Sequence, residues 1–141
     1  AHRAARPPEW ITLEVPLGVG AALEASSEAA RADVILLDCL TLLLSNVLLA
    51  AGDDAAAGDD LELIRAEVEA LLAAHRRLGT HLIVVSNEVG LGLVPAYPLG
   101  RTYRDGLGWA NQILAHIADR AILMVAGLPV DLKALPLALL D

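Results

Sequence analysis

Short apolar runs alternate with longer amphipathic stretches along this chain. Val34–Leu37 is an unbroken apolar run, and His81–Ser86 contains a second one. Both are too short for a helix and do not alternate with polar residues, which is typical of strands buried on both faces of a parallel sheet. Asp38 follows the first run, at the end of a strand where open α/β sheets bind their ligands. An acid at this place either caps the next helix or holds the magnesium that accompanies a phosphate.

Three further segments predict strands. Trp10–Val15 alternates apolar and polar residues, with Glu14 near its end, and Pro16 closes it. Ala121–Val125 predicts the last buried strand. Gly127–Lys133 predicts a turn and a short edge strand.

Helical patterns lie between these strands, at Leu17–Ala30, Leu40–Ala50, Leu61–Leu78 and from Arg101 to about Ala118. The second is apolar nearly all round, which indicates a helix that is buried or lies at a subunit interface. Ala51–Asp60 predicts an acidic loop. Strands that alternate with helices predict one α/β domain over residues 1–141, with three layers and a mostly parallel sheet.

Composition narrows the class of protein. Hydrophobic residues make up 56% of the 141 residues but aromatic residues only 3%, and phenylalanine is absent, so the core must consist of Leu, Ala, Val and Ile. The net charge is −8. An acidic chain without a basic cluster argues against nucleic acid as a partner.

No segment predicts export or a membrane span. The N-terminus is polar and carries Arg3 and Arg6 with no apolar core behind them. The most apolar stretch, Val34–Ala51, contains Asp38, which costs roughly 2.5–3.5 kcal/mol at the centre of a membrane helix. The single cysteine, Cys39, excludes an internal disulfide and fits a reducing compartment. We therefore expect a cytoplasmic protein.

Candidate binding residues follow the second buried strand and open the last helix. Asn87 and Glu88 come directly after the strand, where they could orient a substrate hydroxyl or a metal-bound water. Arg101 and Arg104 are three residues apart and share a helix face, which suits a phosphate or an acid of a neighbouring subunit. Asp105 and Asn111 lie on the same helix and complete this set.

Several blocks, taken in order from His2 to Lys133, carry a family resemblance. They read His2-Arg3-x-x-Arg6-Pro7-x-x-Trp10-x-Thr12-x-Glu14-x-Pro16, then Leu36-Leu37-Asp38-Cys39-Leu40-Thr41 with Asn46, Val85-Ser86-Asn87-Glu88-Val89-Gly90-x-Gly92-x-Val94-Pro95, Arg104-Asp105-x-x-Gly108-x-x-Asn111-Gln112, and Val125-x-Gly127-Leu128-Pro129. In these blocks the chain resembles the bifunctional adenosylcobinamide kinase / adenosylcobinamide-phosphate guanylyltransferase family.

The resemblance implies a P-loop NTPase fold of the RecA-like kind and a role in cobalamin biosynthesis. Family members phosphorylate adenosylcobinamide with a nucleoside triphosphate. They then transfer GMP from GTP to that phosphate through a guanylyl-histidine, which gives adenosylcobinamide-GDP. The resemblance thus implies GTP and ATP as substrates, Mg²⁺ as cofactor, a corrinoid partner and a homotrimer.

The same resemblance assigns roles to individual residues. His2 stands at the position of the guanylylated histidine, and a neutral imidazole is a competent nucleophile at neutral pH. The nucleotide-contacting segment corresponds to Arg3, Ala4, Ala5 and Arg6, together with Glu14. Asp38 matches the acid after the Walker-B-like strand and would bind nucleotide and magnesium. Candidate substrate or interface residues remain Asn87, Glu88, Arg101, Arg104, Asp105 and Asn111.

One block of the family pattern has no counterpart. The family begins with a strand and the P-loop Gly-x-x-x-x-Gly-Lys-Ser/Thr, whereas the only lysine here is Lys133. Without that loop a triphosphate lacks its main-chain cradle. We therefore expect an N-terminally incomplete domain that, by itself, turns over neither substrate.

The residues leave two other functions open. A different P-loop enzyme, such as a small-molecule kinase, would share the strand that ends in an acid but would not need His2. A non-enzymatic α/β interaction domain would not be stabilised by nucleotide, whereas a real site raises stability with ligand concentration.

Overall fold

The two apolar runs form adjacent strands. β1 (Val34–Asp38) and β2 (His81–Val85) pair in parallel, with Val34 opposite His81 and Asp38 opposite Val85. Parallel neighbours need a long crossover connection, and helices α2 (Leu40–Ala51) and α3 (Asp59–Leu78) supply it. The prediction of a parallel strand pair with a helical crossover is confirmed.

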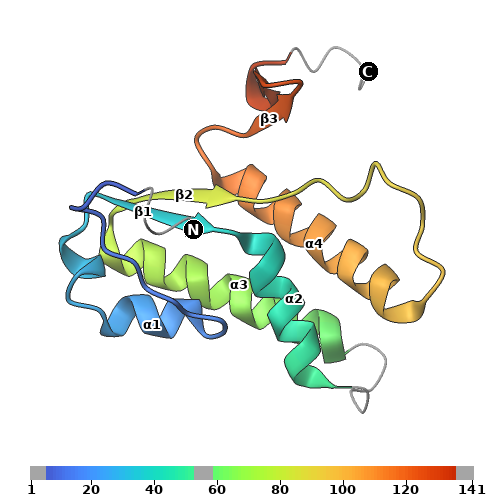
Figure 1. Cartoon of the computed structure of the whole chain (residues 1–141), viewed down its shortest axis with the longest axis horizontal. Helices are drawn as coiled ribbons and strands as arrows, with labels where there is room; N and C mark the ends of the chain where they lie inside the picture. Colours follow the sequence, from blue (N-terminus) through green and yellow to red (C-terminus); the bar gives the residue numbers. More distant parts are fainter. Residues whose placement is uncertain (1–5, 53–58, 136–141) are drawn as a thin grey trace.

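The computed structural model describes residues 6–52 and 59–135. Its other elements are helices α1 (Val19–Ala25) and α4 (Pro98–Ile117), strands β3 (Ile122–Val125) and β4 (Leu128–Asp131), and two single 3₁₀ turns at Ala29–Arg31 and Leu132–Ala134. Figure 1 shows α1, α2 and α3 on one side of the β1–β2 pair, with α4 beside α2 and α3. Within these ranges, no helix has both the length and the apolarity needed to cross a membrane.

The core lies between the helices and one face of the sheet. Its largest fully buried side chains come from α2, α3 and α4: Leu40, Leu44, Ile64, Val68, Leu71 and Leu107. From the sheet, Ile35 and Leu37 of β1 and Val84 of β2 pack against this cluster. The buried cluster contains only aliphatic side chains, as the composition predicts.

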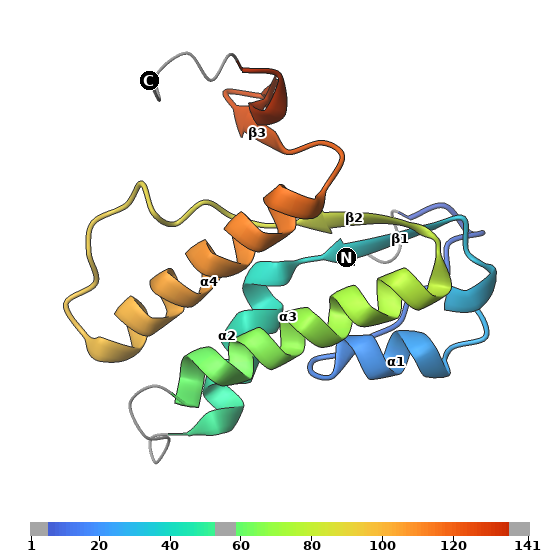
Figure 2. The same ribbon diagram turned by 180° about the vertical axis from the view of Figure 1, so that it is seen from behind.

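The opposite face of the strand pair is exposed. Burial alternates along both strands, so that Leu36 is 43% and Ile83 is 53% exposed. The prediction that β1 and β2 are buried on both faces is therefore wrong for the described residues, because the described helices cover only one face of the strand pair (Figure 2). The described part has two layers where the sequence predicts three.

The last two strands do not join this sheet. β3 and β4 form an antiparallel hairpin that pairs Val125 with Leu128 across the turn. The hairpin stands apart from β1 and β2 in both views (Figures 1 and 2). The prediction that Ala121–Val125 is a buried strand is wrong, since Ile122 and Met124 are exposed.

Two other element boundaries differ from the predictions. Trp10–Val15 is extended but does not pair as a strand. The helix predicted over Leu17–Ala30 ends at Ala25, because Ser26 leaves the helical conformation and its hydroxyl accepts a hydrogen bond from Ala29 N–H, at 3.1 Å. This bond starts the separate 3₁₀ turn.

Close packing explains why α1 contains a glycine. A Cβ atom added at Gly20 would lie 2.4 Å from the main-chain oxygen of Ala70 on α3. The two helices therefore pack with their main chains almost in contact at this point. At the start of α1, the Glu67 carboxylate accepts hydrogen bonds from Gly18 N–H and Val19 N–H.

We expect Gly20→Ala to lower the free energy of unfolding by about 1–3 kcal/mol, because α1 must move away from α3 to admit the methyl group. Gly108→Ala is the matched control. An added Cβ there has no heavy atom within 4 Å, and the substitution should stabilise α4 by about 0.4–1 kcal/mol. Urea unfolding of both variants measures the difference, and equal effects would contradict the packing argument.

Candidate functional site

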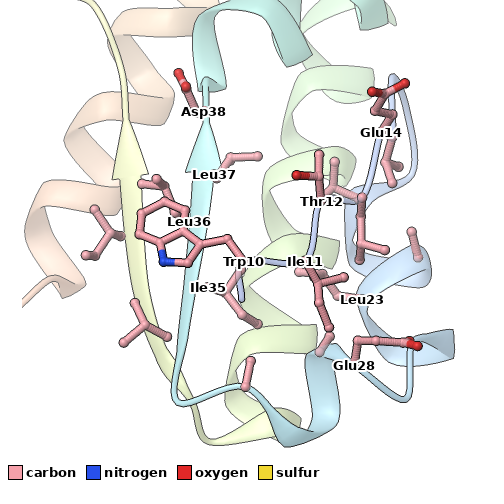
Figure 3. Close-up of a pocket in the computed structure, with 18 of the residues that line it drawn as sticks. Trp10, Ile11, Thr12, Glu14, Leu23, Glu28, Ile35, Leu36, Leu37 and Asp38 are labelled. Atoms are coloured by element: carbon pink, nitrogen blue, oxygen red, sulfur yellow. The ribbon is translucent and has the colours of Figure 1, made fainter. Parts of the chain in front are cut away.

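A pocket separates the extended segment Trp10–Val15 from strand β1. Its walls include the apolar side chains of Leu36 and Leu37, and Figure 3 shows the Trp10 ring across β1 near Leu36. The pocket also explains why the extended segment is no strand, since it keeps this segment away from the edge of β1. Its volume is about 1210 Å³, at or above the upper end of the roughly 300–1,000 Å³ of small-molecule sites.

The lining of this pocket contains three residues that the sequence predicts to bind the nucleotide: Arg6, Glu14 and Asp38. Glu14 and Asp38 lie toward the same end of it in Figure 3. The Arg6 guanidinium donates a hydrogen bond to Thr12 Oγ1, at 3.0 Å, which ties Arg6 to the middle of the segment Trp10–Val15. The sequence separates these residues by as many as 32 positions, and the fold brings them to one pocket.

Asp38 does not cap the helix that follows it. The residue before α2 is Cys39, and no side chain caps this helix. Asp38 is exposed at the carboxyl end of β1, so the geometry favours the second interpretation, an oxygen ligand directed at solvent.

Among the described residues, no three His, Cys, Asp or Glu side chains gather as a metal cluster. Mg²⁺ commonly binds one or two carboxylates and completes its coordination with water and substrate phosphates.

Glu28 lies at the opposite end of the pocket from Asp38 (Figure 3). Its pKa is lowered from the ordinary value, first by a hydrogen bond with its own main chain and then by the hydroxyls of Ser27 and Ser26. The carboxylate form is the one that these hydrogen bonds favour. Both ends of the pocket therefore carry acidic side chains.

The remaining residues of the predicted nucleotide segment, His2, Arg3, Ala4 and Ala5, lie outside the described residues. Their roles stay predictions. Arg6 is the first described residue of that segment.

A second group of polar residues lies beyond the carboxyl end of β2. Asn111 of α4 accepts a hydrogen bond from Ser86 Oγ, at 2.6 Å, and its Nδ2 donates to the main-chain oxygen of Asn87, at 3.0 Å. The N–H of Asn87 donates to Thr41 Oγ1 on α2, at 3.2 Å. Residues from two helices thus bind the first turn of the loop after β2. None of these four residues is part of the lining of the pocket.

The arginines of α4 also bind this loop. Arg104 donates to the main-chain oxygen of Gly90, at 2.6 Å. Arg101 donates to the main-chain oxygens of Pro95 and Ala96. The sequence predicts a phosphate or a neighbouring subunit as their partner, whereas each makes a hydrogen bond to its own chain. Asp105 is exposed on the same helix.

Thr41 and Tyr103 were not predicted as part of this group. The Tyr103 hydroxyl donates to the main-chain oxygen of Thr41, at 3.2 Å, and so joins α4 to the start of α2. A signal for Thr41 exists in the sequence, because a hydroxyl residue lies just after a strand that ends in an acid. Tyr103 carries no such signal, since its partner lies 62 positions away.

Comparisons with known proteins agree with the resemblance seen in the sequence. A family model described as cobinamide kinase / cobinamide phosphate guanyltransferase matches residues 1–132. The chain is 46% identical over 136 residues to the bifunctional adenosylcobalamin biosynthesis protein CobP of Pseudomonas aeruginosa. The aligned region covers 96% of this chain and 73% of that protein. The CobU proteins of Salmonella typhimurium and Escherichia coli, which carry the same description, are 37% and 35% identical over 94% of this chain and 75% of each relative.

Proposed function

The chain belongs to the cobinamide kinase / cobinamide phosphate guanyltransferase family, and we propose that it phosphorylates adenosylcobinamide and then transfers GMP from GTP to the product. One observation supports the nucleotide site: Arg6, Glu14 and Asp38 line the same pocket. Both reactions need a bound nucleoside triphosphate, GTP for the second and ATP or GTP for the first.

We assign the transfer of GMP to His2. A ring nitrogen of the neutral imidazole attacks the α-phosphorus of GTP, the bond to the β-phosphate oxygen breaks, and pyrophosphate leaves. A phosphate oxygen of adenosylcobinamide phosphate then attacks the same phosphorus and breaks the P–N bond, which releases His2 and forms adenosylcobinamide-GDP. Two displacements replace one difficult reaction between two anions, which is the usual advantage of a covalent intermediate. Arg6 can offset negative charge near the transferring group.

Incubation with GTP labelled at the α-phosphate should leave an acid-labile label on the wild-type protein, because phosphoramidates hydrolyse in acid. His2→Ala should lose the label and the guanylyl transfer, but keep much of the kinase reaction, which needs no histidine intermediate. His116→Ala is the control, since His116 is exposed on α4, and it should keep the label. A labelled His2→Ala protein would contradict the assignment.

We assign Mg²⁺ to Asp38, either directly or through water. The exposed carboxylate at the carboxyl end of β1 has the hard oxygen donors that this ion prefers. Charge on the triphosphate is neutralised by the ion when it is bound. The role of Asp38 itself is to hold a negative charge at the mouth of the pocket where the phosphates enter.

Asp38→Asn should reduce both activities roughly 10- to 100-fold and raise the magnesium concentration that each requires, because the amide keeps the shape but loses the charge. Asp119→Asn is the matched control, as Asp119 is exposed after α4 and is not part of the pocket lining. Initial rates measured over a magnesium titration separate the two variants. Equal magnesium dependence in wild type and Asp38→Asn would remove Asp38 from the metal site.

We propose that the phosphate cradle comes from polypeptide outside residues 1–141. The sequence contains no Gly-x-x-x-x-Gly-Lys motif, and the face of the sheet with Leu36 and Ile83 is exposed. A P-loop in such a segment would bind the triphosphate through main-chain N–H groups, and a helix packed on this face would cover the apolar surface.

Calorimetry can test this proposal. The chain of residues 1–141 should bind GTP at least about tenfold more weakly than a form extended by the segment that the relatives have in addition, because main-chain donors to the phosphates are then lacking. Tight, magnesium-dependent binding by residues 1–141 alone would show that the phosphates bind elsewhere.

We further propose a homotrimer. Helix α2 carries exposed leucines on the side away from the core, with Leu42 62% and Leu49 70% exposed. A second copy of the chain would bury this side.

Light scattering at micromolar concentration should give the mass of a trimer for the wild type and of a monomer for Leu42→Glu/Leu49→Glu. Ala50→Glu, at the neighbouring exposed position, is the control for added charge. A monomeric wild type would contradict the proposal.

A further inference from the structure

The main chain of Asn87 is held from two directions, at the peptide unit before the residue and at the one after it. Its N–H donates to Thr41 Oγ1, at 3.2 Å, and its main-chain oxygen accepts from Asn111 Nδ2, at 3.0 Å. Both partners are side chains, one from α2 and one from α4. Main-chain groups past the end of a strand have lost their sheet partners and must find others, and here side chains replace the sheet.

Asn111 uses both ends of its side-chain amide in these contacts. Its Oδ1 accepts from Ser86 Oγ while its Nδ2 donates to Asn87, so that the amide binds two successive residues of the loop. The side chain is half-buried. Such an arrangement fixes a main-chain conformation and leaves little of the amide for a substrate.

Thr41, on the other side, is itself held in place. Its main-chain oxygen accepts from the Tyr103 hydroxyl and from Ser45 Oγ, at 3.2 and 3.0 Å. Since Tyr103 and Asn111 both belong to α4, the helix supports the main chain of Asn87 directly and also through Thr41. The three segments therefore form one connected hydrogen-bond network.

The network determines where the next two side chains lie. Asn87 and Glu88 are exposed, and they follow the strand beside the one that ends in Asp38. The Glu88 carboxylate accepts from Gly90 N–H, and a Cβ at position 90 would lie 2.6 Å from its Oε1. Neither residue lines the nucleotide pocket. They therefore lie outside the nucleotide pocket, after the strand that neighbours the one ending in Asp38, which is a suitable place for a second substrate.

We propose that Asn111 is a positioning residue, which together with Thr41 fixes the main chain on both sides of Asn87 so that Asn87 and Glu88 bind the acceptor, adenosylcobinamide or its phosphate. The inference rests on the proposed function, because it names the side of the site that takes the second substrate. A preorganised loop spares the reaction the cost of ordering it, and a misplacement of about 1 Å can cost on the order of 100-fold in rate.

The test measures the kinase reaction and nucleotide binding separately in the longest active form of the protein. Asn111→Ala should lower kcat/KM for the corrinoid roughly 10- to 100-fold, while the Kd for the nucleotide changes by less than about twofold, because Asn111 lies outside the nucleotide pocket. Thr41→Val should have the same effect. Gln112→Ala, at the next and exposed position of α4, should match the wild type.

The double variant Asn111→Ala/Thr41→Val distinguishes positioning from two independent contacts. Residues that fix the main-chain conformation of the same residue, Asn87, should be non-additive, so the double variant should lose little more than either single variant. Thr41→Ser retains a hydroxyl and should restore most of the activity that Thr41→Val loses.

Results other than these would contradict either the positioning role of Asn111 or the proposed function. Wild-type activity in Asn111→Ala, a fully additive double variant, or an equal loss of nucleotide affinity would overturn the positioning role and leave the proposed function intact. A wild type that neither phosphorylates the corrinoid nor transfers GMP would overturn the proposed function, and this inference with it.

Discussion

The parallel register of β1 and β2 decides which residues can meet at the candidate site. Because Asp38 lies opposite Val85, the chain leaves both strands at the same edge of the sheet. Thr41 and Asn87, three and two residues further on, are then close enough for a hydrogen bond. In an antiparallel pair the two strand ends would lie at opposite edges, and neither this contact nor the neighbourhood of Asp38 and Glu88 would exist. The site therefore depends first on main-chain pairing.

Helix α4 adds a second constraint, on the loop that follows β2. Arg101, Arg104 and Asn111 donate hydrogen bonds to main-chain oxygens between Asn87 and Ala96. Hydrogen bonds of this kind contribute only about 0.5–1.5 kcal/mol each to stability, and exposed ones less. Their main effect is to restrict the conformations of a loop that contains two exposed glycines, Gly90 and Gly92. Restricting such a loop is useful where reacting groups need fixed positions.

Sequence patterns predicted the parts of the fold that local physics determines. The short apolar run Val34–Leu37 corresponds to β1, because its length suits a strand and not a helix. The apolar face of Leu61–Leu78 corresponds to α3, because helical periodicity reflects burial on one side. Apolar and polar residues alternate along Trp10–Val15 as they do in a strand. Whether this segment pairs with β1 depends on the distance between them, and a local sequence pattern carries no information on that distance. The same limit applies to Arg101 and Arg104. Their charge predicts a phosphate or an acid of a neighbouring subunit, which stays a prediction. Their hydrogen bonds to carbonyl oxygens could not be predicted, because every residue has such an oxygen and no sequence pattern marks it.

The family resemblance predicts Arg6, Glu14 and Asp38 as nucleotide-binding residues, and the fold places all three in the lining of one pocket. Their role in nucleotide binding stays a prediction. The resemblance can group such distant residues because the spacing of its blocks reflects a three-dimensional arrangement. It does not describe the network around Asn87, where Thr41 and Tyr103 act through one hydroxyl each. Contacts of this kind become visible only when main-chain positions are known.

The exposed face of the β1–β2 pair shows how sequence and structure can differ without contradiction. Val34, Leu36, Ile83 and Val85 make both strands continuous apolar runs, although each of these side chains is at least 41% exposed. Antiparallel and half-covered sheets place polar residues at such positions, whereas parallel sheets covered on both faces do not. Full burial of a side chain of this size stabilises a protein by about 1.5–3 kcal/mol. A segment that packs on this face therefore gains stability from four side chains at once.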